Sequence, residues 1–148
     1  MIYCIGEYSF VPHKVVWLEQ QDPSSFRCSV VGPSHQSLLH ARLLVPDHKL
    51  YFLSATSSDE AHYAAAYLNS HPVRAWLGGF LHGKQIGTTI FEFMKMKPFD
   101  ANNTVHQRLV RISQQAHKQR DGLRVHDILS ADVEQELSEA VRQVAESQ

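Results

Sequence analysis

The chain has 148 residues, of which 43% are hydrophobic and 20% charged, and its formal net charge at pH 7 is −1. This length suits one domain with a substantial core, and high apolar content with a small net charge excludes a disordered chain. Two cysteines are too few for a disulfide-built secreted fold or a four-cysteine zinc site. Because no run of about 18 apolar residues appears and the N-terminus lacks a signal-peptide pattern, we expect a cytoplasmic protein.

The first half of the chain predicts short strands. Runs rich in aromatic and β-branched residues lie between proline, glycine and aspartate turn residues, which is typical of strands. These runs are Tyr3–Phe10, Lys14–Leu18, Arg27–Val31 and Lys49–Leu53. Residues 38–45 fit either a strand or a short helix, because their periodicity favours neither.

From Ser57 onward, apolar residues recur at helical spacing. Ser57 and Glu60 form a capping box before a helix that ends near Asn69, and Pro72 opens a second helix that runs to Phe80. A loop at residues 83–89, a strand at 90–96 and amphipathic helices at 103–118 and from about residue 130 follow. We therefore predict an α+β fold: a small mixed or antiparallel sheet in the N-terminal half, helices from about residue 58 onward and an amphipathic C-terminal helix.

The motifs for three kinds of catalysis are incomplete. A methyltransferase needs a glycine-rich cofactor loop after a strand and a proline-bearing catalytic loop, and the chain has neither. The run Gly78–Gln85 has the spacing of a phosphate loop, but Gln85 replaces the hydroxyl residue that binds magnesium. Asp22, Asp47 and Lys49 loosely resemble the carboxylates and lysine of a metal-dependent nuclease. The histidines lack zinc-ligand spacing, so we expect no catalytic residue, metal or cofactor.

Two segments carry residues suited to contact with phosphates. Lys14 follows a proline turn and precedes an apolar strand that would hold its stem rigid. In the loop Gly83–Thr89, two glycines let backbone amides approach a phosphate, Lys84 supplies charge, and Gln85 is suited to read a base edge. The alternatives are an edge-strand lysine that prevents aggregation and an ordinary helix-to-strand connection. The basic composition of residues 61–124 permits a phosphate-facing surface, as it also permits solvated helix faces.

Four blocks in order resemble a known family. The blocks are Ile5–Trp17, Leu68–Arg74, Gly83–Thr88 and Val105–Lys118. Together they are similar to the C-terminal specificity region of N6-adenine DNA methyltransferases, which include type II restriction–modification enzymes and proteins with TaqI-like specificity domains. The sequence departs from the family at His13, where an aromatic residue is common, and at Gln85-Ile86, where a Ser-Phe pair follows the loop lysine.

The resemblance implies a target-recognition domain at residues 1–118, which docks on double-stranded DNA and reads its sequence while another module flips and methylates adenine. The candidate DNA-binding residues are His13, Lys14, Gly83, Lys84, Gln85, Gly87, Thr88 and Thr89. We therefore expect a non-catalytic specificity subunit that acts with a separate methyltransferase or restriction subunit in restriction–modification or phage defence. Arg74 is a candidate for a structural bridge to Glu92 or Asp100.

Residues 119–148 form a C-terminal helical extension beyond the resemblance. Its apolar stripe, within Ser130–Val144, has acidic flanks and is suited to pack on the domain, on a partner or on a second copy of the chain. The alternative function is therefore a protein–protein adaptor that keeps the recognition fold without binding DNA and holds an enzyme subunit through this stripe.

Overall fold

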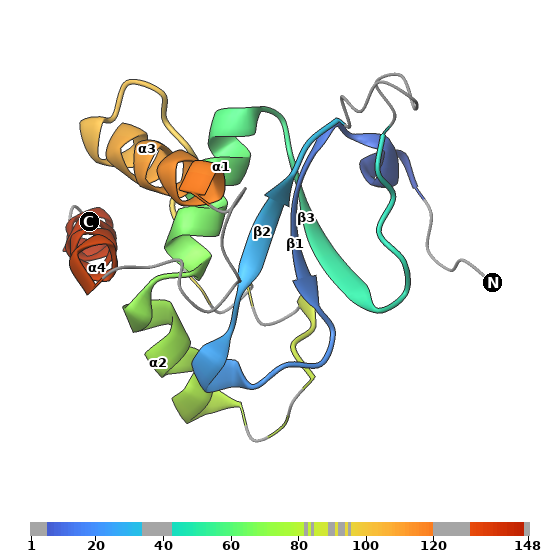
Figure 1. Cartoon of the computed structure of the whole chain (residues 1–148), viewed down its shortest axis with the longest axis horizontal. Helices are drawn as coiled ribbons and strands as arrows, with labels where there is room; N and C mark the ends of the chain where they lie inside the picture. The colour runs from blue at the N-terminus through green and yellow to red at the C-terminus, as the bar shows by residue number, and fades with distance from the viewer. Residues whose placement is uncertain are drawn as a thin grey trace.

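A computed structural model of the chain describes residues 6–33, 43–81, 83, 85–88, 91, 94, 96–119 and 131–146. The elements in chain order are the 3-10 helix η1 (Glu7–Phe10), β1 (His13–Leu18), the 3-10 helix η2 (Pro23–Ser25), β2 (Cys28–Val31), β3 (Leu50–Ala55), α1 (Ser58–Leu68), α2 (His71–Phe80), α3 (Thr104–Gln119) and α4 (Ala131–Glu146). The α+β fold is confirmed, and the sheet is antiparallel (Figure 1). In the part of the chain that the structure describes, no helix combines the length and hydropathy needed to cross a membrane.

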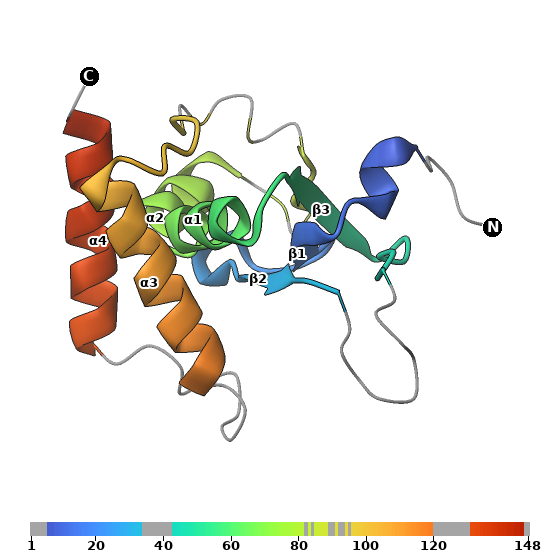
Figure 2. The same ribbon diagram turned by 90° about the horizontal axis from the view of Figure 1, so that it is seen from above.

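The sheet has the order β2-β1-β3, with β1 at its centre. Residues alternate between the two faces of a strand, so Val15 and Trp17 share one face and Lys14 and Val16 the other. Val15 and Trp17 are buried beneath the helices. Figure 2 shows the order of the layers, with η1 beyond the sheet on one side and α1, α3 and then α4 on the other.

The helix α1 lies between two hydrophobic clusters. One cluster joins α1 and α2 to the sheet, and includes Val15, Trp17, Phe26, Ala61, Ala65, Leu68, Leu77 and Ile86. The other joins α1 to α3 and α4, and includes Tyr63, Ala66, Leu109, Ile112, Leu137, Val141 and Val144. A helix that is apolar on most of its surface is stable only when it is buried on most sides, and the alanines of α1 let both layers approach it closely.

Most of the predicted elements are confirmed near their expected boundaries. The Ser57 hydroxyl accepts a hydrogen bond from the Glu60 amide at 3.1 Å, as the capping box predicts. The Glu60 carboxylate, however, accepts from the backbone amide and hydroxyl of Thr56, both at 2.6 Å, one residue before the N-cap. Asn103 caps α3, since its side chain accepts from the Val105 amide at 2.9 Å. The helix α2 begins around Pro72 and ends at Phe80, as expected.

Two strand predictions are wrong where the structure describes the residues. Glu7–Phe10 form the 3-10 helix η1, because the Ser9 amide closes a turn on the Gly6 carbonyl at 2.9 Å and the Ser9 hydroxyl accepts from the Gly6 amide. Within the strand predicted at 90–96, Phe91, Met94 and Met96 lie outside any strand. Phe91 instead packs edge-on against Trp17, with 4.9 Å between ring centroids. Of residues 38–45, only 43–45 are described, and they have no regular structure.

Candidate functional site

Lys14 is buried, so the prediction that it contacts phosphate is wrong. Only 1% of its surface is exposed. Its ammonium group donates a hydrogen bond to the Val11 carbonyl and lies 6.0 Å from the centroid of the Phe52 ring. Burial lowers the pKa of this amine from its ordinary value. The physical reason is that η1 lies over the face of the sheet that carries Lys14: Tyr8 stacks on Phe52 with 5.8 Å between ring centroids.

The structure separates His13 from the predicted loop. His13 begins β1 opposite Ala55, whereas Gln85 in the loop forms a β-bridge with Gln20, beyond the other end of β1. At a rise of about 3.3 Å per residue, roughly 20 Å of chain lies between these two positions. His13 therefore belongs to a different end of the sheet from Gln85.

At its own end of the sheet, His13 lies near two other histidines. The rings of His62 and His117 meet edge to face, with 5.0 Å between centroids. Burial, followed by the charges of His117 and His13, outweighs the opposing effect of Asp59 and lowers the pKa of His62 to about 4. The His62 Nδ1 atom lies 3.0 Å from the Ser113 hydroxyl. These contacts join α1 to α3 and give His62 and His117 a structural role.

The predicted loop is fixed to the sheet through Ile86. This side chain is fully buried in the cluster beneath the sheet. Its amide donates to the Glu19 carbonyl at 2.9 Å, and its carbonyl accepts from the Trp17 indole at 2.9 Å. The loop residues Gln85 and Thr88 are exposed, and Gly83 is exposed as well. The backbone at Gln85 and Ile86 is therefore held in a defined place, with the Gln85 side chain at the surface.

Of the other predicted loop residues, the structure describes Gly87 but not Lys84 or Thr89. Gly87 is half-buried next to Ile86. Gln85 donates from its side-chain nitrogen to the Glu19 carboxylate at 3.0 Å, so an incoming base edge would exchange this hydrogen bond for its own.

Two arginines, neither of them among the predicted DNA-binding residues, lie at the same end of the sheet as the loop. Gln21, next to the Gln20 that pairs with Gln85, accepts from the Arg27 amide at 2.9 Å and donates to the Arg27 carbonyl at 3.4 Å. Arg27 and Arg74 line an open hollow of about 600 Å³ between α2 and the η2–β2 segment. We call this cavity the arginine hollow; its lining residues are Ser24, Arg27, His71, Arg74, Ala75 and Gly78.

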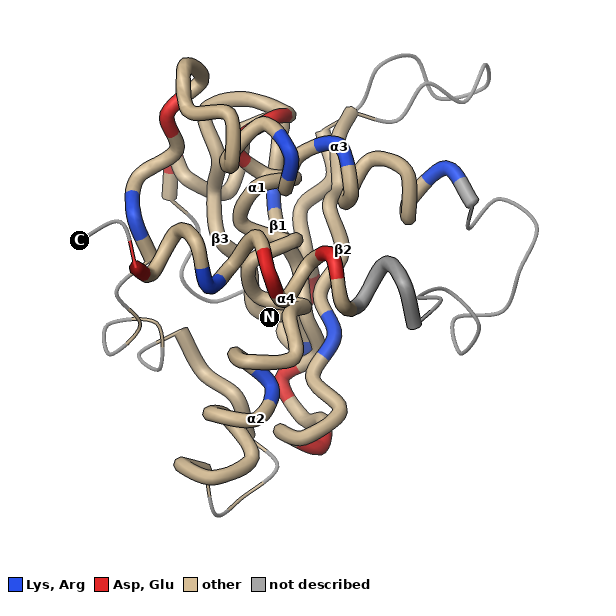
Figure 3. The backbone as a smooth tube through the Cα atoms, turned by 90° about the vertical axis from the view of Figure 1, so that its left-hand side faces the viewer, with Lys and Arg blue, Asp and Glu red and all other residues tan. Residues whose placement is uncertain are grey.

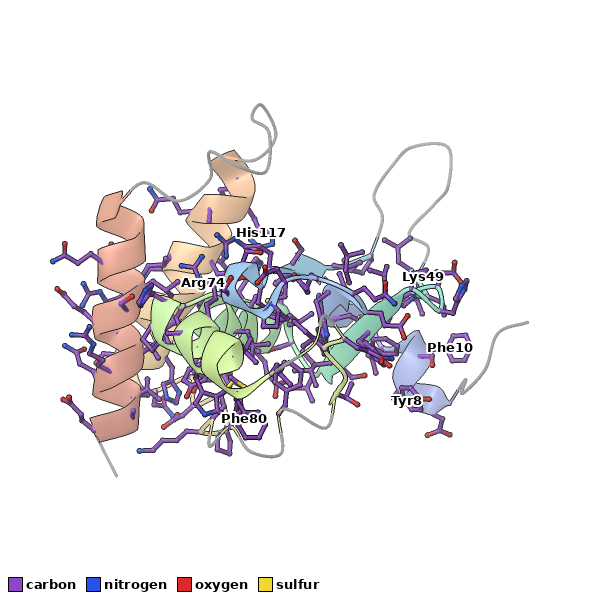
Figure 4. All side chains as sticks on the ribbon, turned by 90° about the horizontal axis from the view of Figure 1, so that it is seen from below. Tyr8, Phe10, Lys49, Arg74, Phe80 and His117 are labelled. Atoms are coloured by element: carbon purple, nitrogen blue, oxygen red, sulfur yellow. The ribbon has the colours of Figure 1, made fainter. Side chains whose placement is uncertain are left out.

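The shape of the arginine hollow follows from local structure. His71, Arg74 and Gly78 recur at helical spacing and so share one face of α2. Asp22 caps η2, accepting from the Ser24 amide at 2.9 Å, which sets Ser24 against that face. A Cβ placed on Gly78 would lie 3.4 Å from the Ser24 Cβ, so helix and turn meet at ordinary contact distance. Figure 4 shows Arg74 on the side of the molecule away from Tyr8 and Phe10.

The guanidinium groups of the hollow are electrostatically coupled. Desolvation by burial lowers the pKa of Arg74, and the charge of Arg27 lowers it further. Desolvation also lowers the pKa of Arg27, although the neighbouring Cys28 acts in the opposite direction. Arginine remains protonated despite such shifts, so the fold holds two like charges beside one cavity. Among the described residues that line it, none is acidic.

The apolar stripe of the C-terminal helix is used inside the chain. Leu137, Val141 and Val144 are buried in the cluster with α1 and α3, and Arg108 of α3 pairs with Glu136 of α4 at 3.0 Å. Of the alternatives for this stripe, the structure has it packed on the domain. These three side chains are therefore covered by α1 and α3, whereas the side chain of Val133 lies outside the described residues and an oligomer through this helix stays a prediction.

The carboxylates of the nuclease alternative are bound by their own neighbours. Asp47 accepts from the backbone amide of His48 at 2.6 Å and lies 2.7 Å from the His48 ring nitrogen. This hydrogen bonding lowers the pKa of Asp47. Asp22 holds Ser24, as described above. Within the part of the chain that the structure describes, no three histidine, cysteine or acidic side chains are grouped to hold a metal ion.

Comparisons of the chain with protein-family models, with curated proteins and with solved structures found no match.

Proposed function

We propose that the chain is a non-catalytic DNA target-recognition module that acts with a separate N6-adenine DNA methyltransferase or restriction–modification subunit. The observation that carries the proposal is the loop fixed by Ile86, which presents Gln85 and Thr88 at the end of the sheet that also carries Arg27. Recognition of duplex DNA needs both kinds of group: contacts to phosphates position the protein, and contacts to base edges read the sequence.

Rigid presentation favours sequence reading over non-specific attraction. A glutamine amide can donate one hydrogen bond and accept another in a bidentate pair, which matches the major-groove edge of adenine. Because Ile86 is fully buried, donates from its amide to Glu19 and accepts at its carbonyl from the Trp17 indole, Gln85 loses little backbone freedom when it binds. Figure 3 shows basic and acidic positions interspersed over one side of the molecule, so that side offers no broad positive field and local groups would supply the affinity there.

The test is selection of a bound sequence from a pool of random duplexes at low salt, with the full chain alone and with any methyltransferase that co-purifies from its host. We expect enrichment of a short sequence. Gln85→Ala should relax the preference at one position and leave affinity for the unselected pool nearly unchanged. Absence of an enriched sequence in both arms would refute the proposal.

A second candidate function, the protein–protein adaptor, is favoured by exposed apolar side chains that do not belong to the loop. Tyr8 is 48% and Phe10 is 53% exposed on η1, and the segment before β3 exposes Leu43, Leu44 and Val45. Exposed aromatic residues are enriched at protein interfaces. An adaptor would lose its partner in the Phe10→Ser variant and show no affinity for duplex DNA at low salt, which separates it from the recognition module.

A further inference from the structure

We infer that the arginine hollow is a binding site for a phosphate group, with Arg27 and Arg74 as its two charged ligands. As a contact to the backbone of duplex DNA, the site rests on the proposed function. As a site for free phosphate or a phosphate monoester, it does not. The chemistry is the same in both cases: a tetrahedral oxyanion that accepts several N–H donors at once.

The two guanidinium groups are held by different means. Arg74 is only 6% exposed and comes from the middle of α2, so its stem is fixed by the surrounding side chains. Arg27 is exposed, and one of its terminal nitrogens donates to the Phe26 carbonyl at 2.8 Å. Arg74 is therefore held in a fixed place, and Arg27 has further N–H donors available at the rim of the hollow. Together they offer the planar, multi-donor groups that suit phosphate oxygens.

The electrostatics of the hollow favour an anion. The like charges of Arg27 and Arg74 repel one another, and an anion bound beside them offsets part of that repulsion. His71, the first residue of α2, also lines the hollow. The N-terminal end of the α2 dipole adds a partial positive charge there.

The hollow also has room for a ligand because its α2 face carries small side chains. Ala75 and Gly78 form that face below Arg74. Ala75 is exposed, so a longer side chain at this position would enter the hollow without disturbing a packed cluster. This position provides a variant that tests the site without removing either arginine.

Asp22 sets a limit on the affinity. Its carboxylate accepts from the amide and the hydroxyl of Ser24, at 2.9 and 2.6 Å, which brings a negative charge to the rim. Asparagine is an equally good cap. Asp22→Asn should therefore keep η2 and strengthen phosphate binding severalfold.

The experiment is a titration of the full chain with inorganic phosphate against chloride of equal ionic strength, followed by NMR or calorimetry. We expect saturable binding of phosphate. Arg27→Gln should weaken it about tenfold, the usual effect of losing a charge-assisted hydrogen bond, and Ala75→Glu should abolish it. The matched controls are Arg111→Gln and Gln115→Glu, at exposed positions of α3, and both should bind as the parent chain does.

A second arm uses duplex DNA and identifies the source of the phosphate. If the site holds a backbone phosphate, Arg27→Gln weakens binding to all sequences and reduces the salt slope by about 1. If Arg27→Gln weakens phosphate binding but leaves DNA binding unchanged, the hollow is a site for free phosphate. If the parent chain does not bind DNA at all, only the proposed function is overturned. The inference itself is overturned if phosphate binds no better than chloride, or if Arg27→Gln and Ala75→Glu both bind like the controls.

Discussion

The two ends of β1 carry opposite kinds of surface. At the His13 end, η1 covers the sheet, Lys14 is buried under it, and η1 exposes Tyr8 and Phe10 together with Glu7. At the other end, the chain continues into residues 19–21. Glu19 accepts a hydrogen bond from the Ile86 amide of the loop, and Gln21 accepts one from the Arg27 amide just before β2. A cation in a strand is thus not evidence of a cationic surface. Contacts between distant segments decide which charges face the solvent.

The largest expected effect in this comparison comes from Ile86. Replacing it with alanine removes a fully buried side chain, and such substitutions cost about 2–5 kcal/mol. The free energy of unfolding, measured in urea by circular dichroism, should fall by that amount, and the sequence preference of the loop should be lost with it. A matched substitution, Val45→Ala, alters an exposed side chain outside both hydrophobic clusters and should change stability by less than about 0.5 kcal/mol. Equal effects of the two would show that the loop is not anchored.

The next effect is a loss of stability in acid that originates at the His13 end. The pKa of His62 is lowered to about 4 in the folded chain, so the unfolded chain takes up a proton first as the pH falls. The contribution of His62 to the free energy of unfolding is therefore fully present above about pH 6.5 and is lost between pH 6.5 and pH 4. We expect this loss to be about 2 kcal/mol after allowance for the partial exposure of the side chain. His106 acts in the same direction, because burial lowers its pKa too.

The measurement for this effect is the free energy of unfolding at pH 7.5, 6, 5 and 4.5. His62→Asn retains a partner for the Ser113 hydroxyl and removes the titrating group, so it should reduce the pH dependence clearly. Gln115→Asn, at an exposed position of α3, is the control and should leave the pH dependence unchanged. A pH profile that His62→Asn does not alter would contradict the structural role of this histidine.

A smaller effect is expected at Lys14, and it sharpens the contrast with Arg27. Lys14→Met removes a buried charge while keeping the stem, so the free energy of unfolding should change by less than about 1.5 kcal/mol in either direction. Its affinity for duplex DNA at low salt should equal that of the parent chain. If Lys14→Met bound DNA more weakly than Arg27→Gln did, the DNA-binding surface would lie at the Lys14 end of the sheet and not at the Arg27 end.

The sequence predicted most elements because their patterns are local. Alternation in Lys14–Leu18 and the helical spacing behind Ser57 each involve neighbouring residues, and the structure has both elements in place. The turn at Ser9 competes with strand pairing through a side-chain hydrogen bond, which an alternating pattern does not reveal. A fixed boundary such as the Asn103 cap is likewise readable from one residue type.

The site was predicted less completely because it depends on long-range contacts. The loop at Gly83–Thr89 was singled out by its own residues, but burial of Ile86 follows from its contacts with Trp17 and Glu19. Arg27 and Arg74 line one hollow only because η2 packs on α2. The helical spacing of His71, Arg74 and Gly78 was a signal available in the sequence. Nothing in the local pattern around Arg27 indicated its place beside them.

The smallest effect concerns the two glycines of α2, which differ in what surrounds them. A Cβ on Gly79 would have no heavy atom within 4 Å, whereas one on Gly78 would meet Ser24 at 3.4 Å. Both positions are helical, so alanine at either should raise the free energy of unfolding by about 0.5–1 kcal/mol through helix propensity. Only Gly78→Ala places a methyl group in the arginine hollow, so only this variant should change phosphate affinity, by less than tenfold. If Gly79→Ala changed phosphate affinity as much as Gly78→Ala, the effect would come from the rigidity of α2 and not from the hollow.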